Sequence, residues 1–153
     1  MTSIHLREGG CQCGKIRYRI VGEAHMLYAC HCTDCQKQST SAFGMSLIVD
    51  VDQVEIFQGE DSLRHWETRG DDGGLKRCAF CPDCGSRLFH GGGDRLSVKA
   101  GSLDQTDDLE PIAHIWLRSA QPWLRPDADK ILCFDRGPED GAELERIWRE
   151  KLD

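Results

Sequence analysis

The number and grouping of its cysteines constrain this chain more than any other feature of the sequence. Nine cysteines occur among 153 residues, and eight of them lie within three positions of another cysteine. The odd number argues against a complete disulfide framework. Structural cysteines buried in a core have no reason to cluster in this way, whereas metal ligands do. The sequence therefore predicts thiolate metal sites, and zinc is the expected ion. The nine residues are Cys11, Cys13, Cys30, Cys32, Cys35, Cys78, Cys81, Cys84 and Cys133.

Two closely spaced pairs predict a structural zinc site. Cys81 and Cys84 are separated by two residues and followed by Gly85, a spacing that lets both sulfurs reach one ion. Cys11 and Cys13, again followed by a glycine, supply a second pair. Because a structural zinc takes four ligands, commonly as two such pairs, we expect these four cysteines to bind one ion. The site would connect the beginning of the chain to its middle.

The segment CHCTDC, residues 30–35, predicts a second and different site. Its three cysteines can bind one zinc and leave the fourth position open, which is the mark of a catalytic zinc. A short helix is expected over 33–39 with Thr33 as its N-cap, and its dipole would favour the thiolate forms. Two alternatives remain open, because His31 or Cys78 could close the site as a fourth ligand. Cys133 is expected in the core.

Short strands separated by Gly and Asp predict a mainly β fold in one domain over residues 1–153. The core is expected over about 4–138, and a C-terminal helix over about 140–152, where apolar residues share one helical face. Trp66, Trp116 and Trp123 are expected in the core or in pocket walls. The expected strands are 15–21, 26–29, 43–49, 54–57, 63–68, 87–90, 96–100 and 112–117.

Composition excludes some classes of function. A net charge of −7 argues against binding to a phosphate backbone, so no nucleic-acid partner is expected. No apolar run approaches the ~18–20 residues that span a bilayer, so no membrane partner is expected. Residues 1–11 lack the apolar segment of a secretory signal, and we expect a cytoplasmic protein.

Three motifs together resemble one known family. They are GGCQCG at 9–14, CHCTDC at 30–35 and FCPDCGS at 80–86, in this order and spacing. The segments AHIW at 113–116 and QPWL at 121–124 add to the resemblance. The combination is similar to the glutathione-dependent formaldehyde-activating enzyme family, whose domain is shared with centromere protein V. The similarity extends over about residues 4–138.

The resemblance implies a β-tent, in which coiled antiparallel sheets are stapled by zinc. It implies two zinc ions per chain, a structural one held by Cys11, Cys13, Cys81 and Cys84 and a catalytic one held by Cys30, Cys32 and Cys35. It also implies carbon–sulfur lyase chemistry, in which formaldehyde and glutathione form S-(hydroxymethyl)glutathione. The expected partner is thus a small-molecule thiol. Basic residues that could meet the glutathione carboxylates are Lys37, Arg64, Arg69, Lys76 and Arg118, although solvent-exposed charges are the expectation for each.

Two other functions stay open from the sequence. The chain could be a zinc-stapled binding module without turnover, or a redox-responsive protein whose Cys30, Cys32 and Cys35 oxidise and release zinc. An exchangeable fourth ligand at the second site favours an enzyme, and a fourth protein ligand favours a binding module.

Overall fold

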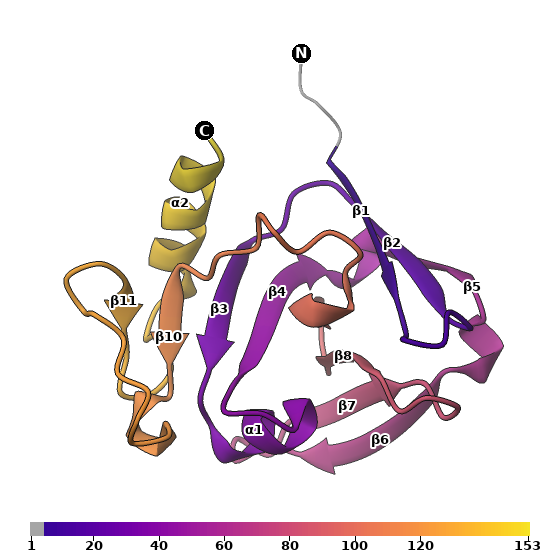
Figure 1. Cartoon of the computed structure of the whole chain (residues 1–153), viewed down its shortest axis with the longest axis horizontal. Coiled ribbons are helices and arrows are strands. Elements are labelled where there is room, and N and C mark those ends of the chain that lie inside the picture. The colour runs from indigo at the N-terminus through magenta and orange to yellow at the C-terminus, as the bar shows by residue number, and fades with distance from the viewer. Residues whose placement is uncertain (1–4) are drawn as a thin grey trace. The chain divides into compact units, whose positions relative to one another are not determined.

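A computed structural model describes residues 5–153 and is mainly β, with short helices and a helix at the C-terminus (Figure 1). Backbone contacts divide the chain into two compact units. The first contains residues 5–24 and Ile48–Asp108, and the second contains His25–Leu47 and Leu109–Asp153. The mainly β prediction is confirmed. The expectation of a single domain stays a prediction, and residue 4, where its core was expected to begin, lies outside the described residues.

The first unit contains a three-stranded antiparallel sheet in the order β1-β2-β5, built from β1 (Leu6–Gly10), β2 (Arg17–Val21) and β5 (Val54–Gln58) (Figure 1). The alternation of polar and apolar residues in β2 explains its orientation. Tyr18 and Ile20 are buried, whereas the arginines beside them remain partly exposed. A strand with period-two alternation covers a core with one face in this way.

The same unit contains a meander of four antiparallel strands. They are β6 (Arg64–Arg69), β7 (Leu75–Phe80), β8 (Arg87–Gly91) and β9 (Arg95–Lys99). The ring of Tyr18 on β2 meets the ring of Phe89 on β8 edge to face, with centroids 4.8 Å apart. Short 3₁₀ helices lie at Val51–Gln53 (η1), Glu60–Ser62 (η2) and Ala100–Ser102 (η3).

Strand β7 was not expected from the sequence. Its segment LKRCAF places two basic residues beside each other and shows little alternation. It becomes a strand because it pairs with β6 along its whole length on one side and with β8 on the other side. Non-local pairing decided this element, as it commonly does for β structure.

The second unit orders its strands β11-β10-β3-β4. β10 pairs in parallel with both β3 and β11, so the expectation of antiparallel sheets is wrong for this unit. Parallel neighbours need long connections, and more than eighty residues separate β3 from β10. Strand β4 belongs to both units, because its residues from Ile48 to its end are assigned to the first unit. The elements are β3 (Met26–Cys30), α1 (Thr33–Ser39), β4 (Gly44–Asp50), β10 (Ala113–Ile115), η4 (Leu117–Ser119), β11 (Leu132–Cys133) and α2 (Gly141–Leu152).

The C-terminal helix α2 forms where the sequence predicts it. Asp140 caps it by accepting a hydrogen bond from the N–H of Ala142 at 2.9 Å. Leu144 and Trp148 are buried, and the helix packs on β3. Over residues 5–153, no helix has both the length and the apolar character needed to cross a membrane.

Two tryptophans correct the sequence prediction. Trp66 is 52% exposed and Trp123 is 71% exposed, so neither is a core residue. Trp66 lies on β6, the last strand of its sheet, where little packs against it. Trp116 is half-buried and has a φ of 59°, which ends β10 at Ile115, two residues earlier than expected.

The difference in burial between Trp148 on α2 and Trp123 provides a test of how α2 packs. We expect Trp148→Ala to lower the free energy of unfolding by about 3 kcal/mol, because it empties a buried site on α2. The matched variant Trp123→Ala, which removes an exposed ring, is expected to change it by less than about 0.5 kcal/mol. Urea unfolding followed by circular dichroism measures both. Equal losses from the two variants would contradict the packing of α2.

Candidate metal centres

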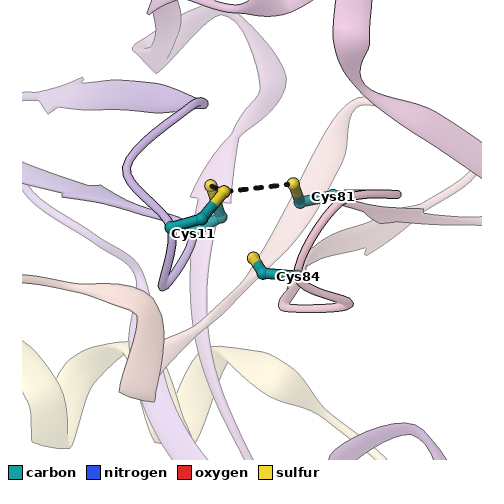
Figure 2. Close-up of side chains that lie close together, drawn as sticks. Cys11, Cys81 and Cys84 are labelled. Carbon is teal, nitrogen blue, oxygen red and sulfur yellow. Dashed lines mark hydrogen bonds between the residues drawn. The ribbon is translucent and has the colours of Figure 1, made fainter.

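Four sulfur atoms meet in the first unit, from two turns that are far apart in sequence. The turn after β1 carries Cys11 and Cys13, and the turn after β7 carries Cys81 and Cys84. All four sulfurs lie within 4.8 Å of one another, and Figure 2 shows those of Cys11, Cys81 and Cys84 facing one another. The Cys11–Cys13 and Cys13–Cys81 sulfur separations are 3.5 and 3.8 Å. Thiolates around a tetrahedral zinc lie about 3.8 Å apart, so the donor set fits this ion.

The two turns have matching backbone structure. In the first, the N–H of Gly14 donates to the carbonyl of Cys11 at 3.0 Å. In the second, the N–H of Gly85 donates to the carbonyl of Cys81 at 2.8 Å. Both glycines have left-handed φ values, 80° and 79°, which L side chains rarely adopt. The glycine that follows each pair of cysteines is therefore required by the turn.

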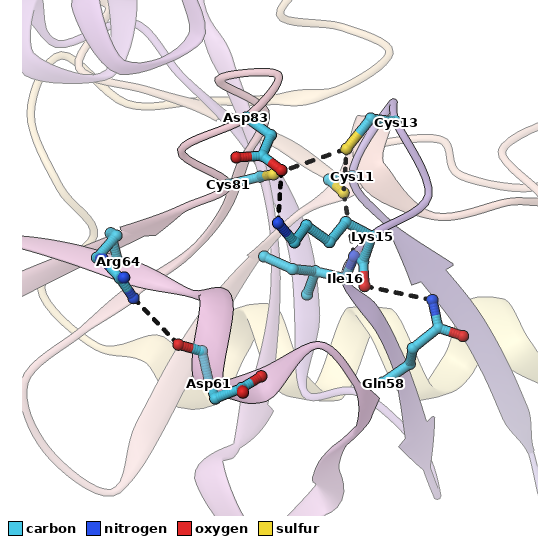
Figure 3. Close-up of polar contacts among 9 residues, drawn as sticks. All are labelled: Cys11, Cys13, Lys15, Ile16, Gln58, Asp61, Arg64, Cys81 and Asp83. Carbon is cyan, nitrogen blue, oxygen red and sulfur yellow. Dashed lines mark hydrogen bonds and ion pairs between the residues drawn. The ribbon is translucent and has the colours of Figure 1, made fainter.

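Three contacts join the turns to each other and to their sheet, and Figure 3 shows the one between Lys15 and Asp83. The N–H of Gln12 donates to the hydroxyl of Ser86 at 2.9 Å. Lys15 forms an ion pair with Asp83 at 2.6 Å, which raises the pKa of this lysine. Gln58 of β5 donates to the carbonyl of Gly14 at 2.9 Å. These three contacts hold the turns without involving the sulfurs, and the N–H of Ile16 also donates to the sulfur of Cys11 at 3.2 Å.

Cys84 and Cys13 differ widely in acidity in the absence of a metal. The hydroxyl and the N–H of Ser86 lower the pKa of Cys84 to about 5. The N–H of Lys15 lowers the pKa of Cys13, but its sulfur neighbours, Cys11 first, raise it to about 12. Cys84 therefore forms a thiolate readily, whereas the neighbouring sulfurs oppose a negative charge on Cys13. A dication removes this opposition, because metal binding requires deprotonated ligands.

Three further sulfur atoms meet in the second unit. Cys30 ends β3, Cys32 precedes α1, and Cys35 lies in its first turn. Their sulfurs lie within 4.8 Å of one another. The contacts with Cys32 and Cys35 raise the pKa of Cys30, as expected where like charges would be forced together.

The N-cap of α1 differs from the prediction. Cys32, with φ −65° and ψ 155°, is the N-cap, and its sulfur accepts a hydrogen bond from the N–H of Cys35 at 3.3 Å. Thr33 is instead the first residue of the helix. A sulfur can take the capping role because the extended backbone at Cys32 directs it over the first turn.

His31 does not join this group. Its side chain is fully buried, and its Nε2 lies 2.8 Å from Nδ1 of His114. The ring packs against Phe43, with centroids 5.2 Å apart. Burial, and then the neighbouring His114, lowers the pKa of His31, so its imidazole is neutral. Cys78, buried in β7, also belongs to neither sulfur group, so among residues 5–153 the second group has three cysteine ligands.

Gln36 is a residue that the sequence analysis missed. From α1, its amide donates to the carbonyls of His31 and Ser119 at 2.8 and 2.9 Å. Its own carbonyl accepts from Gln121 at 3.0 Å. These bonds fix the cysteine segment to residues 119–121. A glutamine in a seven-residue helix gives no sequence signal, because two of its three partners, Ser119 and Gln121, are more than eighty residues away.

The basic residues considered for glutathione are divided between the two units. Arg64 and Arg69 donate to backbone carbonyls of their own hairpin arm, at Asp61 and Gly73 (Figure 3 shows the first). Lys76 also lies in this arm, on β7. Lys37 and Arg118 lie in the second unit, on α1 and η4. The expectation that Cys133 lies in the core is wrong, because this residue is only partly buried, on the two-residue strand β11.

The turn geometry generates a second test. Gly85→Ala is expected to lower the free energy of unfolding by about 1 kcal/mol, because alanine disfavours a left-handed φ. Gly101→Ala is the matched control, since an added Cβ meets no atom within 4 Å at either position and only Gly85 has a left-handed φ. Urea unfolding compares the two variants. A loss at Gly101 as large as that at Gly85 would contradict the role of the turn.

Comparisons with known proteins agree with the motifs. A search of curated proteins finds no match to the chain. Among solved structures, a Rhodobacter sphaeroides protein solved by structural genomics aligns with a TM-score of 0.49 and 12% identity, covering 83% of this chain and 98% of that chain. The profile described as "glutathione-dependent formaldehyde-activating enzyme" matches residues 6–119. The chain therefore belongs to the glutathione-dependent formaldehyde-activating enzyme family.

Proposed function

We propose that this protein is a zinc-dependent enzyme of the carbon–sulfur lyase type that acts on a thiol–aldehyde adduct. The nominal reaction joins glutathione and formaldehyde as S-(hydroxymethyl)glutathione. The observation that carries the proposal is that a chain of this family contains a three-sulfur group in addition to a four-sulfur group. Membership of the family supplies the nominal substrates, and the sulfur geometry supplies the division of roles.

The four-sulfur group is proposed as the structural site. Cys11, Cys13, Cys81 and Cys84 complete a tetrahedral set, which leaves no position for a substrate. The site connects the turn after β1 to the turn after β7, and so joins the two sheets of the first unit. In this proposal it is the staple of a β-tent.

The three-sulfur group is proposed as the catalytic site. Cys30 and Cys35 are buried, while Cys32 is partly exposed, so the open position is reached from the side of Cys32. When bound there, zinc would activate a thiol or polarise an aldehyde oxygen. Three thiolates outweigh the charge of a dication, so an anionic thiolate is drawn by the open coordination position and not by net charge.

The remaining residues of the second unit hold this segment in place. The carbonyl of His31 accepts hydrogen bonds from Gln36 and from the hydroxyl of Ser119, at 2.8 and 3.0 Å. The neutral ring of His31 is held by His114 behind the cysteines. In the reaction, the substrate sulfur bonds to the aldehyde carbon, and the thiol proton moves to the aldehyde oxygen. The addition also proceeds without a catalyst, so positioning and thiol activation suffice.

All nine cysteines are free thiols, as suits a reducing compartment. We place the enzyme in the cytoplasm, with a small-molecule thiol such as glutathione as its partner.

Zinc content tests the proposal first. We expect elemental analysis of the purified protein to find two zinc ions per chain, of which a mild chelator removes one readily. A site with an open position exchanges its metal more easily than a closed four-thiolate site. One tightly held zinc, with free thiols at Cys30, Cys32 and Cys35, would contradict the catalytic site and favour a binding module.

Paired cysteine variants test the division of roles. Cys32→Ser is expected to keep the fold, lose one zinc and abolish the acceleration of adduct formation. Exchange NMR with ¹³C-formaldehyde measures the rate of adduct formation. Cys84→Ser is expected to lower the melting temperature by ~10 °C or more, because the structural site contributes to folding. Matching thermal melts for the two variants would overturn the assignment.

The redox-responsive alternative makes a different prediction for the same sample. It requires that peroxide release zinc from the three-sulfur group reversibly while the four-sulfur group keeps its ion. A protein that accelerates adduct formation and keeps both ions under these conditions is an enzyme in the proposed sense.

A further inference from the structure

A cavity of about 440 Å³ lies within the first unit, separate from the chemistry proposed above. It is lined on one side by β5 and its neighbouring 3₁₀ turns, and on the other by strands β6 to β9. Its volume lies in the ~300–1,000 Å³ range of small-molecule sites. Of the described residues that line it, none is a cysteine. Its apolar walls include Val54, Ile56, Leu63, Ala79, Phe89 and Leu96.

The strand register explains why these walls face one space. His65 pairs with Ala79, and Ala79 with Phe89, so these three side chains stand in one row on one face of the meander. Arg77, Gly91 and Leu96 form the next row on that face. The cavity therefore has an apolar floor with a guanidinium group at its edge.

Glycines keep part of this space empty. A Cβ at Gly91 would meet the carbonyl of Arg95 at 2.9 Å, so close backbone packing requires glycine there. At Gly93 a Cβ would meet no atom within 4 Å, and no left-handed φ restricts the residue. The chain thus leaves room at this end of the cavity that a side chain could have filled.

The charged residues of the lining favour an anion. Two arginines, Arg77 and Arg95, line the cavity together with one acid, Glu60. Burial, followed by the charge of Arg77, lowers the pKa of His65, so this ring is neutral. The excess of positive charge stands out in a chain with a net charge of −7.

Arg77 is available to a ligand at low cost. It forms an ion pair with Glu67, with Nε and Oε1 3.0 Å apart, and both side chains are about half exposed. Exposed pairs of this kind contribute little to stability, so the guanidinium can exchange Glu67 for the anionic group of a ligand.

We propose that this cavity binds a small amphipathic anion, a carboxylate attached to an apolar chain or ring. The apolar part lies against Ile56, Phe89 and Leu96, and the carboxylate meets Arg77. The site goes beyond the proposed function, because it needs neither zinc nor any cysteine.

Three probes that share one chain length but differ in charge test the proposal. They are octanoate, which is an anion, 1-octanol, which is neutral, and octylammonium, which is a cation. Calorimetry on the full-length protein is expected to give octanoate a Kd on the order of 1 mM. The alcohol should bind about fivefold more weakly, and the ammonium ion more weakly still. Amide shifts in ¹H–¹⁵N spectra should locate octanoate at Ala79, Gly91 and Leu96.

Neighbouring basic residues on β7 provide matched variants. Arg77→Gln is expected to weaken octanoate about fivefold and to leave octanol unchanged, since only the carboxylate loses its partner. Lys76→Gln removes the same charge from the opposite face of the strand, outside the lining, and should change neither probe. Ala79→Leu fills the cavity and should abolish binding of both probes. If that variant does not fold, Gly93→Leu makes the same test in open space.

Several results would overturn the proposal. One is the absence of heat and of shifts at these amides with octanoate at about 10 mM. Others are equal binding of the three probes, equal effects of Arg77→Gln and Lys76→Gln, or shifts confined to residues outside the cavity. None of these results depends on zinc content or on adduct formation, so they are distinguishable from a failure of the proposed function.

Discussion

The meeting of four sulfur atoms from two tight turns is the constraint on which the first unit depends. Each turn ends a strand of a different sheet, and each needs a left-handed glycine directly after its second cysteine, at Gly14 and Gly85. The Lys15–Asp83 pair and the Gln12–Ser86 bond hold the turns together, but both are exposed and so contribute modestly. The sulfur neighbours of Cys13 raise its pKa, so they oppose a negative charge on this residue when no cation is bound. A dication converts that opposition into a crosslink between sheets.

The second sulfur group is built differently, and the difference bears on function. Its three cysteines lie within six residues, so local backbone structure alone brings them together. The tertiary structure adds hydrogen bonds that hold the residue between the first two cysteines, His31. The carbonyl of His31 is held by Gln36 and Ser119, and its ring by His114. The side toward Cys32 stays accessible. A three-cysteine group held by these hydrogen bonds, with one partly exposed member, suits the metal-assisted chemistry proposed above.

The cavity beneath β5 depends on neither sulfur group. The strand register collects Phe89, Leu96 and Arg77 on one face, and Gly93 leaves open a space that a side chain could have filled. The β6–β7 arm that forms one wall is thinly covered, which is why Trp66 is exposed there. A chain of this family thus combines two compact thiolate groups with an apolar, arginine-edged space in the same unit as the first of them.

The sequence by itself determined the features that depend on local spacing. Cysteine spacing, the glycines that follow each pair, the alternation in 17–21 and the apolar face of 140–152 are local signals, and their physical causes act over a few residues. The mainly β fold and the grouping of cysteines in space follow them. Tertiary structure alone decided β7, the parallel pairing of β10, the bonds of Gln36 to residues 119–121 and the exposure of Trp123. Each of these depends on partners distant in the chain, and side-chain pattern within a short window carries no record of such partners.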